Sequence, residues 1–127
     1  PFIVSHTGVC GVKDMWRNVT NLQVKRVAQS DGVIGIIFHK MFLGPSVSRG
    51  HIDTLVDHMA HVIDVAGEDF VALGSDWDGA ITTPDAMPTV LELPRLVEEM
   101  LQRNWSAERI QKILSLNYLR VFKQIRP

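Results

Sequence analysis

The sequence predicts an α/β fold built on a parallel sheet, and two observations carry this prediction. Three short runs are almost entirely apolar and rich in β-branched residues, as is typical of strands covered on both faces. Between and after these runs, apolar residues recur at helical spacing. The three runs are residues 2–4, 33–38 and 70–74. Strands alternating with helices in this way favour parallel pairing through crossover helices.

The first run leads into His6, which predicts a buried strand that delivers a polar side chain at its carboxyl end. A glycine-containing loop follows. Either Thr20 or Asn21 can then cap a helix, whose apolar side we expect to carry Leu22, Val24, Val27 and Ala28. This helix is expected to end at Gly32, directly before the second strand.

The second strand is followed by a predicted loop and then by a longer helix over residues 51–66, which Gly67 can terminate. After the third strand, a proline-containing loop leads to a helix over residues 93–103. Ser106 fits the cap of a further helix that runs toward the end of the chain.

Polar residues follow each strand, at His6, His39 and Asp76. In parallel α/β folds, ligands bind at the carboxyl ends of the strands. Three strands make a small sheet for this many helices, and a (β/α)₈ barrel takes about 250 residues. The 127 residues are therefore interpreted as a part of such a barrel.

The composition argues against several classes of function. The chain carries 13 Lys and Arg against 14 Asp and Glu, and its net charge of −1 offers no basic field for nucleic acid or a membrane surface. No apolar run approaches the roughly 18 residues that span a bilayer. The single cysteine, Cys10, cannot form an internal disulfide. A lone cysteine is compatible with a cytoplasmic location, which the sequence leaves open.

Asp76 and Asp78 stand at alternate positions after the third strand and are followed by Gly79. A carboxylate at this end of a buried strand is a candidate functional group, although Asp-Gly is also ordinary turn chemistry. Phosphatases of the haloacid-dehalogenase type carry a similar Asp-x-Asp-Gly string. Ala80 replaces the threonine of that motif, and no carboxylate pair for magnesium follows.

Arg17 and the pair His58 and His61 are further candidate residues. Arg17, in the loop after His6, can recognise a carboxylate, although a lone loop arginine is more often a solvated charge. His58 and His61 share a helix face, where two histidines could bind a metal. We interpret them instead as structural histidines, because the same helix has to bury its apolar stripe and no further ligand is nearby.

Taken in order, a set of short strings covers essentially the whole chain. The strings are PFIVSHTG at 1–8, RNV at 17–19, VDHMAH at 56–61, VAG at 65–67, GSDWDG at 74–79, LPRL at 93–96, RNWS at 103–106 and NYLRVF at 117–122. This ordered set resembles the membrane dipeptidase (renal dipeptidase, peptidase M19) family, zinc peptidases of the amidohydrolase superfamily.

The resemblance implies a (β/α)₈ barrel of the metal-dependent hydrolase type that hydrolyses dipeptides with two zinc ions, bridged by a glutamate and a water. Zinc lowers the pKa of such a water and polarises a carbonyl. His6 matches the last histidine ligand of the family. Asp76 matches the aspartate after the eighth strand, which serves in proton transfer and holds the substrate amino group. Arg17 matches the arginine that binds the terminal carboxylate of the dipeptide.

The main departure from the family pattern is an absence. The family's His-x-Asp pair, its bridging glutamate and one histidine have no counterpart in this chain, nor do strands one to five. Residues 1–127 are thus expected to form the last three βα units, strands six to eight. A catalytic zinc takes about three protein ligands, so we expect the isolated chain to be inactive. The rest of the barrel, or a second copy of the chain, is the expected protein partner.

Two smaller departures are Trp77, where many relatives have phenylalanine, and Leu-Ser-Leu-Asn at 114–117 in place of Leu-Gly-Gly-Asn. The sequence therefore predicts dipeptide hydrolysis by the complete protein. The alternative is a degenerate family member that binds a peptide or a structural partner without hydrolysis. A His-x-Asp pair and a glutamate encoded ahead of Pro1 would favour the enzyme.

Overall fold

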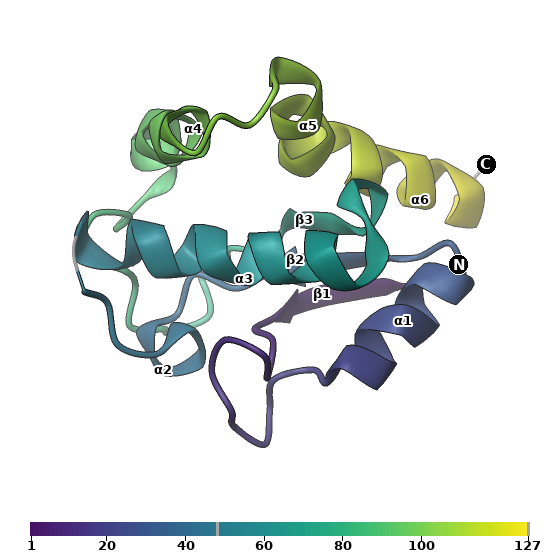
Figure 1. Ribbon diagram of the computed structural model, residues 1–127, viewed down its shortest axis with the longest axis horizontal. Coiled ribbons are helices and arrows are strands. Elements are labelled where there is room, and N and C mark those ends of the chain that lie inside the picture. The colour runs from purple at the N-terminus through teal and green to yellow at the C-terminus, as the bar shows by residue number, and fades with distance from the viewer. Residues whose placement is uncertain (48, 127) are drawn as a thin grey trace.

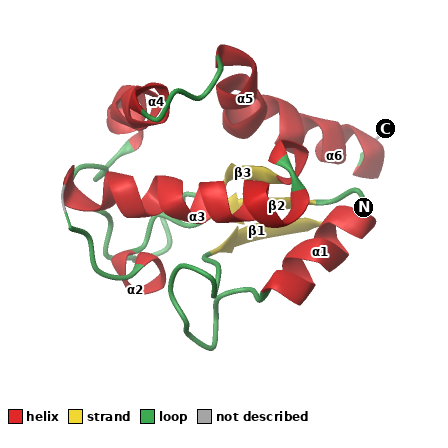
Figure 2. Cartoon of the chain, in the orientation of Figure 1, coloured by secondary structure: helices red, strands yellow, loops and turns green. Residues whose placement is uncertain are grey.

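A computed structural model describes residues 1–47 and 49–126. Its sheet contains three parallel strands in sequential order, with β2 in the centre (Figure 1). The strands are β1 (Ile3–Thr7), β2 (Val33–Ile36) and β3 (Val71–Leu73). Figure 2 shows helices between and after the strands, which confirms the predicted parallel α/β architecture.

The helices flank this small sheet. They are α1 (Asn21–Gln29), α2 (Lys40–Leu43), α3 (Ile52–Ala66), α4 (Leu93–Gln102), α5 (Ala107–Gln111) and α6 (Asn117–Ile125), with a π-helical stretch at Lys112–Leu116 that joins α5 to α6. Short 3₁₀ turns lie at Arg49–His51, Glu68–Phe70 and Val90–Glu92. In Figure 1, α3 runs across the sheet, with α1 beside β1 and α6 beyond β3. None of the described helices is long and apolar enough to cross a membrane.

The start of α1 is a capping box. The Thr20 hydroxyl accepts from the Gln23 N–H, and the Gln23 side chain accepts from the Thr20 N–H at 2.8 Å. Thr20 is therefore the cap of the two candidates. The expectation for Leu22 is wrong, because its side chain is 68% exposed. The expectation is confirmed for Val24 and Val27, which supply the buried face of the helix.

Most of the other boundaries follow the sequence signals. Gly67 ends α3 with φ 109°, and the Ser106 hydroxyl caps α5 by accepting from the Arg109 N–H. The one-turn helix α2 was not predicted, because four residues are too short for helical periodicity to show. The third strand is also shorter than expected, since Phe70 belongs to the preceding 3₁₀ turn.

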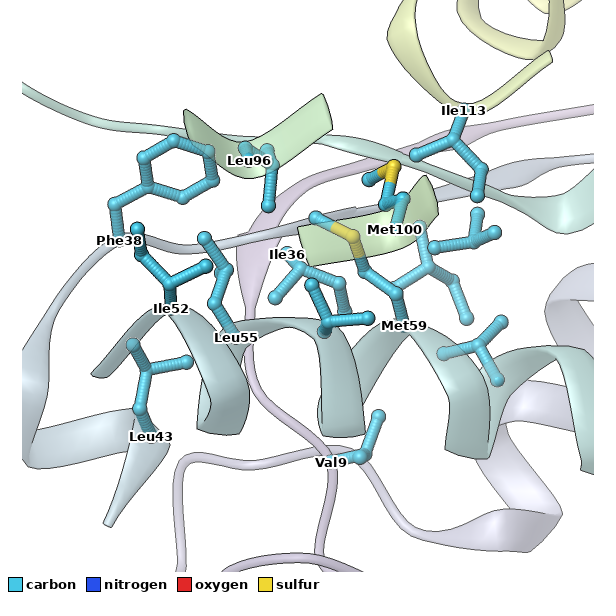
Figure 3. Packing of buried hydrophobic residues seen from close by; sticks show 14 of the residues in the cluster. Val9, Ile36, Phe38, Leu43, Ile52, Leu55, Met59, Leu96, Met100 and Ile113 are labelled. Carbon is cyan, nitrogen blue, oxygen red and sulfur yellow. The ribbon is translucent and has the colours of Figure 1, made fainter. Parts of the chain in front are cut away.

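The core lies mainly between α3 and the sheet and extends under α4. Figure 3 shows Leu55 and Met59 of α3 facing Ile36 of β2, with Leu96 and Met100 of α4 beside them. All five are fully buried. This packing leaves the carboxyl ends of the strands, rather than their flanks, as the place where polar side chains gather.

Alternate residues of β2 face opposite sides of the sheet, as in any strand. Ile34 and Ile36 belong to the large core. Val33 instead joins Ala72 of β3 and Val121 of α6 in a second, smaller cluster. Helix α6 therefore covers the amino ends of the strands and is anchored away from the cavity described below.

Candidate active site

The carboxyl ends of the strands and the loops that follow them line a cavity of about 290 Å³. His6 of β1, Arg17 of the loop between β1 and α1, and Asp76 after β3 all border it. The sequence indicates each of these three residues separately, and the fold brings them to one cavity. The other lining residues are Ile37, His39, Met41, Phe42, Gly79, Ala80 and Ile81.

His6 lies in a β-bulge. Val4 pairs with Ile34 but Thr7 pairs with Ile36, so β1 has one extra residue between the two pairs. A bulge bends a strand and redirects its side chains, and bulges are frequent beside active sites. The Nδ1 atom of His6 is 2.9 Å from the hydroxyl of Ser5, so Nε2 is the ring nitrogen that can bind a metal ion.

Asp76 has a left-handed backbone, with φ 60°. The N–H of Gly79 donates to the Asp76 carbonyl at 2.9 Å and closes a turn directly after β3. A Cβ atom on Gly79 would lie 2.3 Å from Oδ1 of Asp76. The carboxylate therefore occupies the space that any other residue at position 79 would fill. Strained backbones of this kind cost about 1–3 kcal/mol and cluster at functional sites.

Trp77 holds the loop that leaves this turn. Its indole N–H donates to the Met87 carbonyl at 3.2 Å, and its ring meets Phe38 edge-on with centroids 5.1 Å apart. The residues from Ser75 to Asp78, together with Pro88, Thr89 and Val90, line a second cavity of about 660 Å³. Asp76 thus borders both cavities.

Arg17 lies beside two aromatic rings. Its guanidinium carbon is 5.1 Å from the ring centroid of Phe42 and 5.7 Å from that of Trp16. Aromatic faces stabilise a guanidinium without neutralising it. No carboxylate pairs with Arg17 among the described residues. The group can therefore bind a ligand carboxylate through two parallel hydrogen bonds.

His39 is a cavity residue whose place at a strand end the sequence indicated, but to which we assigned no role. Its Nδ1 is 3.2 Å from the Thr82 carbonyl. A carbonyl only accepts, so Nδ1 donates. In the neutral ring, Nε2 is then an acceptor. Its position directly after the second apolar run is the sequence signal that places His39 at this edge of the sheet.

The two histidines of α3 have structural partners, as expected from the sequence. His58 is fully buried: its Nδ1 accepts from the Val9 N–H at 2.9 Å, and its Nε2 lies 3.1 Å from the Leu43 carbonyl. Burial lowers the pKa of His58 from 6.5 to about 4. His61 Nε2 is 2.7 Å from Oδ1 of Asn21. His58 therefore has both ring nitrogens engaged by the protein.

The residues fit a metal site only in part. His6 offers one imidazole nitrogen at the cavity, a donor suited to zinc. Within residues 1–47 and 49–126, no group of three His, Cys, Asp or Glu side chains lies close enough to hold an ion. A catalytic zinc takes about three protein ligands. The described residues therefore supply a portion of a metal site.

Two solved structures share this fold over nearly the whole chain. One is a metallopeptidase from Rhodobacter sphaeroides liganded with a phosphinate mimic of the dipeptide L-Ala-D-Ala (TM-score 0.88, 29% identity, 97% of this chain and 36% of that one). The other is dipeptidase AC, a metallopeptidase of family M19 (TM-score 0.87, 30% identity, 95% and 35% of the two chains). The chain thus has the α/β fold that these two metallopeptidases contain.

The family follows from the sequence comparison. The model of the membrane dipeptidase family, peptidase family M19, matches residues 1–127, and the chain belongs to this family. It is 35% identical over 126 residues to an uncharacterized dipeptidase of Schizosaccharomyces pombe, covering 98% of this chain and 30% of that protein. A Klebsiella pneumoniae protein described as uncharacterized is 36% identical, with 98% and 47% covered. The chain therefore spans less than half the length of these relatives.

Proposed function

We propose that this chain forms part of the active site of a zinc-dependent dipeptidase. The observation that carries the proposal is the shared cavity, which Arg17, Asp76 and His6 line together. A cation, a carboxylate and a metal-binding imidazole are the three groups that a small peptide with two charged ends needs for recognition and hydrolysis.

Each residue has a role that its chemistry supports. Arg17 binds the terminal carboxylate of the substrate, because its charge is unpaired among the described residues and its guanidinium is held by aromatic rings. Asp76 holds the free amino group and accepts or returns a proton. Binding both ends of the peptide within about 290 Å³ selects short substrates. The dipeptide mimic bound by the Rhodobacter relative supports this substrate class.

His6 is the residue of this chain that would hold zinc. When bound, zinc supplies an activated water and polarises the scissile carbonyl. Since the described residues contain no group of three ligands, we expect the isolated 127-residue chain to lack activity even with added zinc. Hydrolysis of a dipeptide by this chain alone would contradict that expectation.

The proposal is tested by steady-state hydrolysis of L-Ala-D-Ala by the metal-loaded enzyme that contains this chain. We expect Asp76→Asn to lower kcat/KM by about 100-fold or more, since a proton-transfer group is lost. We expect Arg17→Met to raise KM by about 10-fold or more with a smaller change in kcat, since a binding contact is lost. Asp64→Asn, which neutralises an exposed carboxylate of α3, is the control and should change neither constant.

The alternative of a non-catalytic family member gives a different result. In that case the wild-type protein binds the dipeptide mimic but does not hydrolyse dipeptides, and the Arg17 variant weakens binding alone. Hydrolysis that is insensitive to both substitutions would show that the cavity is not the active site.

A further inference from the structure

Two buried side chains tie the loop after β1 to the end of α2. The first is His58, which reaches from α3 to the backbone of Val9 on one side and of Leu43 on the other. Val9 lies in the loop that carries Arg17, and Leu43 is the last residue of α2. One imidazole therefore links two segments that are far apart in sequence and both border the cavity.

Asn18 makes the second tie. Its Oδ1 accepts from the Gly8 N–H at 3.1 Å, and its Nδ2 donates to the carbonyls of Lys13 at 2.8 Å and Phe42 at 3.0 Å. The side chain is 5% exposed. A Cβ atom on Gly8 would lie 2.5 Å from Oδ1, so the amide fits closely against the loop.

Arg17 lies between these two ties. Asn18 is its neighbour in the chain, and the ring of Phe42, next to Leu43, lies 5.1 Å from its guanidinium. Arg17 itself is exposed and makes no ion pair with the described residues, so ion pairing does not hold it in place. Its position depends on how the loop after β1 sits against α2.

The partners of His58 also define its protonation. The Val9 N–H can only donate, so Nδ1 carries no proton, and the Leu43 carbonyl can only accept, so Nε2 carries one. The charged ring would set an N–H against the Val9 N–H. The nearby titratable groups are Asp57 and His61 of the same helix. A neutral imidazole therefore matches the bridging geometry, whereas an aliphatic side chain would leave two buried backbone groups unpaired.

We propose that His58 is a positioning residue for Arg17. By bridging Val9 and Leu43, it holds the loop after β1 against α2, in the position that presents the guanidinium to the cavity. The inference rests on the proposed function, in which Arg17 binds the substrate carboxylate. His58 itself lies behind the cavity wall and does not touch the substrate.

The test is a double-mutant cycle between His58 and Arg17 in the metal-loaded enzyme. We expect His58→Leu to raise KM for L-Ala-D-Ala by about tenfold with little change in kcat, because a misplaced binding group weakens binding. In the Arg17→Met background, the same change should alter KM by less than about twofold, because the group being positioned is gone. Equal effects of His58→Leu in both backgrounds would overturn the proposal.

Asn117→Leu is the matched control. Asn117, like His58, is a buried side chain with two hydrogen bonds to the backbone; it donates both, to the carbonyls of Glu68 and Val71 at the opposite ends of the strands. Its loss should leave KM unchanged. If it raises KM as much as His58→Leu does, the effect of His58 is one of general stability and the proposal fails.

If His58→Leu does not fold, the cycle is run with His58→Asn and His58→Gln. Asparagine places an acceptor near the Nδ1 position and glutamine places a donor near the Nε2 position, so each keeps one of the two bonds. Amide hydrogen exchange at Val9 gives a readout independent of activity, and it should be faster in His58→Gln than in His58→Asn. Equal exchange in both variants would contradict the bridge.

The failure of the two proposals can be told apart. If the proposed function is wrong, Arg17→Met leaves dipeptide KM unchanged. If only the positioning role is wrong, Arg17→Met raises KM while His58→Leu acts additively or not at all.

Discussion

The position of the Asp76 carboxylate depends on the absence of a side chain at Gly79, three residues later. A Cβ atom on Gly79 would lie 2.3 Å and 2.5 Å from the two carboxylate oxygens. We expect Gly79→Ala to rotate the carboxylate away and to lower kcat/KM by about tenfold or more. The free energy of unfolding should change by less than about 1 kcal/mol, because position 79 is exposed and a flexible side-chain end can move.

To check this, kcat/KM and urea unfolding are measured for Gly79→Ala in the wild-type and in the Asp76→Asn background. Once Asp76 is asparagine and the proton-transfer group is already lost, Gly79→Ala should have little further effect on kcat/KM. A loss of activity that is equally large in both backgrounds would show that Gly79 acts independently of the carboxylate.

His58 makes the fold sensitive to acid. Burial lowers its pKa from 6.5 to about 4, so the folded protein binds fewer protons than the unfolded chain between these values. The contribution of the neutral ring to the free energy of unfolding is fully present above about pH 6.5. It is lost as the pH falls toward 4, and the total loss is up to about 3 kcal/mol.

Urea unfolding at about pH 7.5 and about pH 4.5 tests this coupling. Between these two pH values, the free energy of unfolding of the wild-type protein should fall by about 2–3 kcal/mol more than that of His58→Asn, which has no titrating ring at this position. Parallel losses in the two proteins would mean that other groups account for the acid sensitivity.

At the scale of elements, one buried amide contributes to the link between the last helices and the sheet. Asn117, at the start of α6, donates to the carbonyls of Glu68 at 2.7 Å and Val71 at 2.8 Å and so joins the π-helical stretch to the start of β3. The buried Val71 carbonyl and the part-buried Glu68 carbonyl each lose this hydrogen bond in Asn117→Ala. We expect the free energy of unfolding to fall by about 2–4 kcal/mol, measured by urea denaturation. A fall below about 0.5 kcal/mol would show that water replaces the amide.

The sequence predicted the elements whose signals are local. Apolar runs predicted the strands, and Ser106 and Gly67 predicted helix ends. The positions of His6 and Asp76 after apolar runs predicted that both lie at one edge of the sheet. The β-bulge at His6 depends on pairing with β2, and no single strand reveals its own register. The stacking of Phe42 on Arg17 and the bonds of His58 join residues far apart in sequence, so they appear only in the folded chain.

At the scale of the whole molecule, the described residues bring together one side of the proposed dipeptidase site. They provide a guanidinium, a carboxylate and one imidazole around a cavity of about 290 Å³. The sheet order leaves β1 and β3 as edge strands of the described part. Since the chain spans 47% or less of the length of these relatives, we propose catalysis for the metal-loaded enzyme and not for these residues alone.

The most direct measurement is a crystal structure of the metal-loaded enzyme with a phosphinate mimic of L-Ala-D-Ala. The account predicts that the carboxylate of the ligand lies within hydrogen-bond distance of the Arg17 guanidinium, that its amino group contacts Asp76, and that Nε2 of His6 binds a metal ion. A ligand bound elsewhere, or one whose carboxylate and amino group avoid Arg17 and Asp76, would contradict the account.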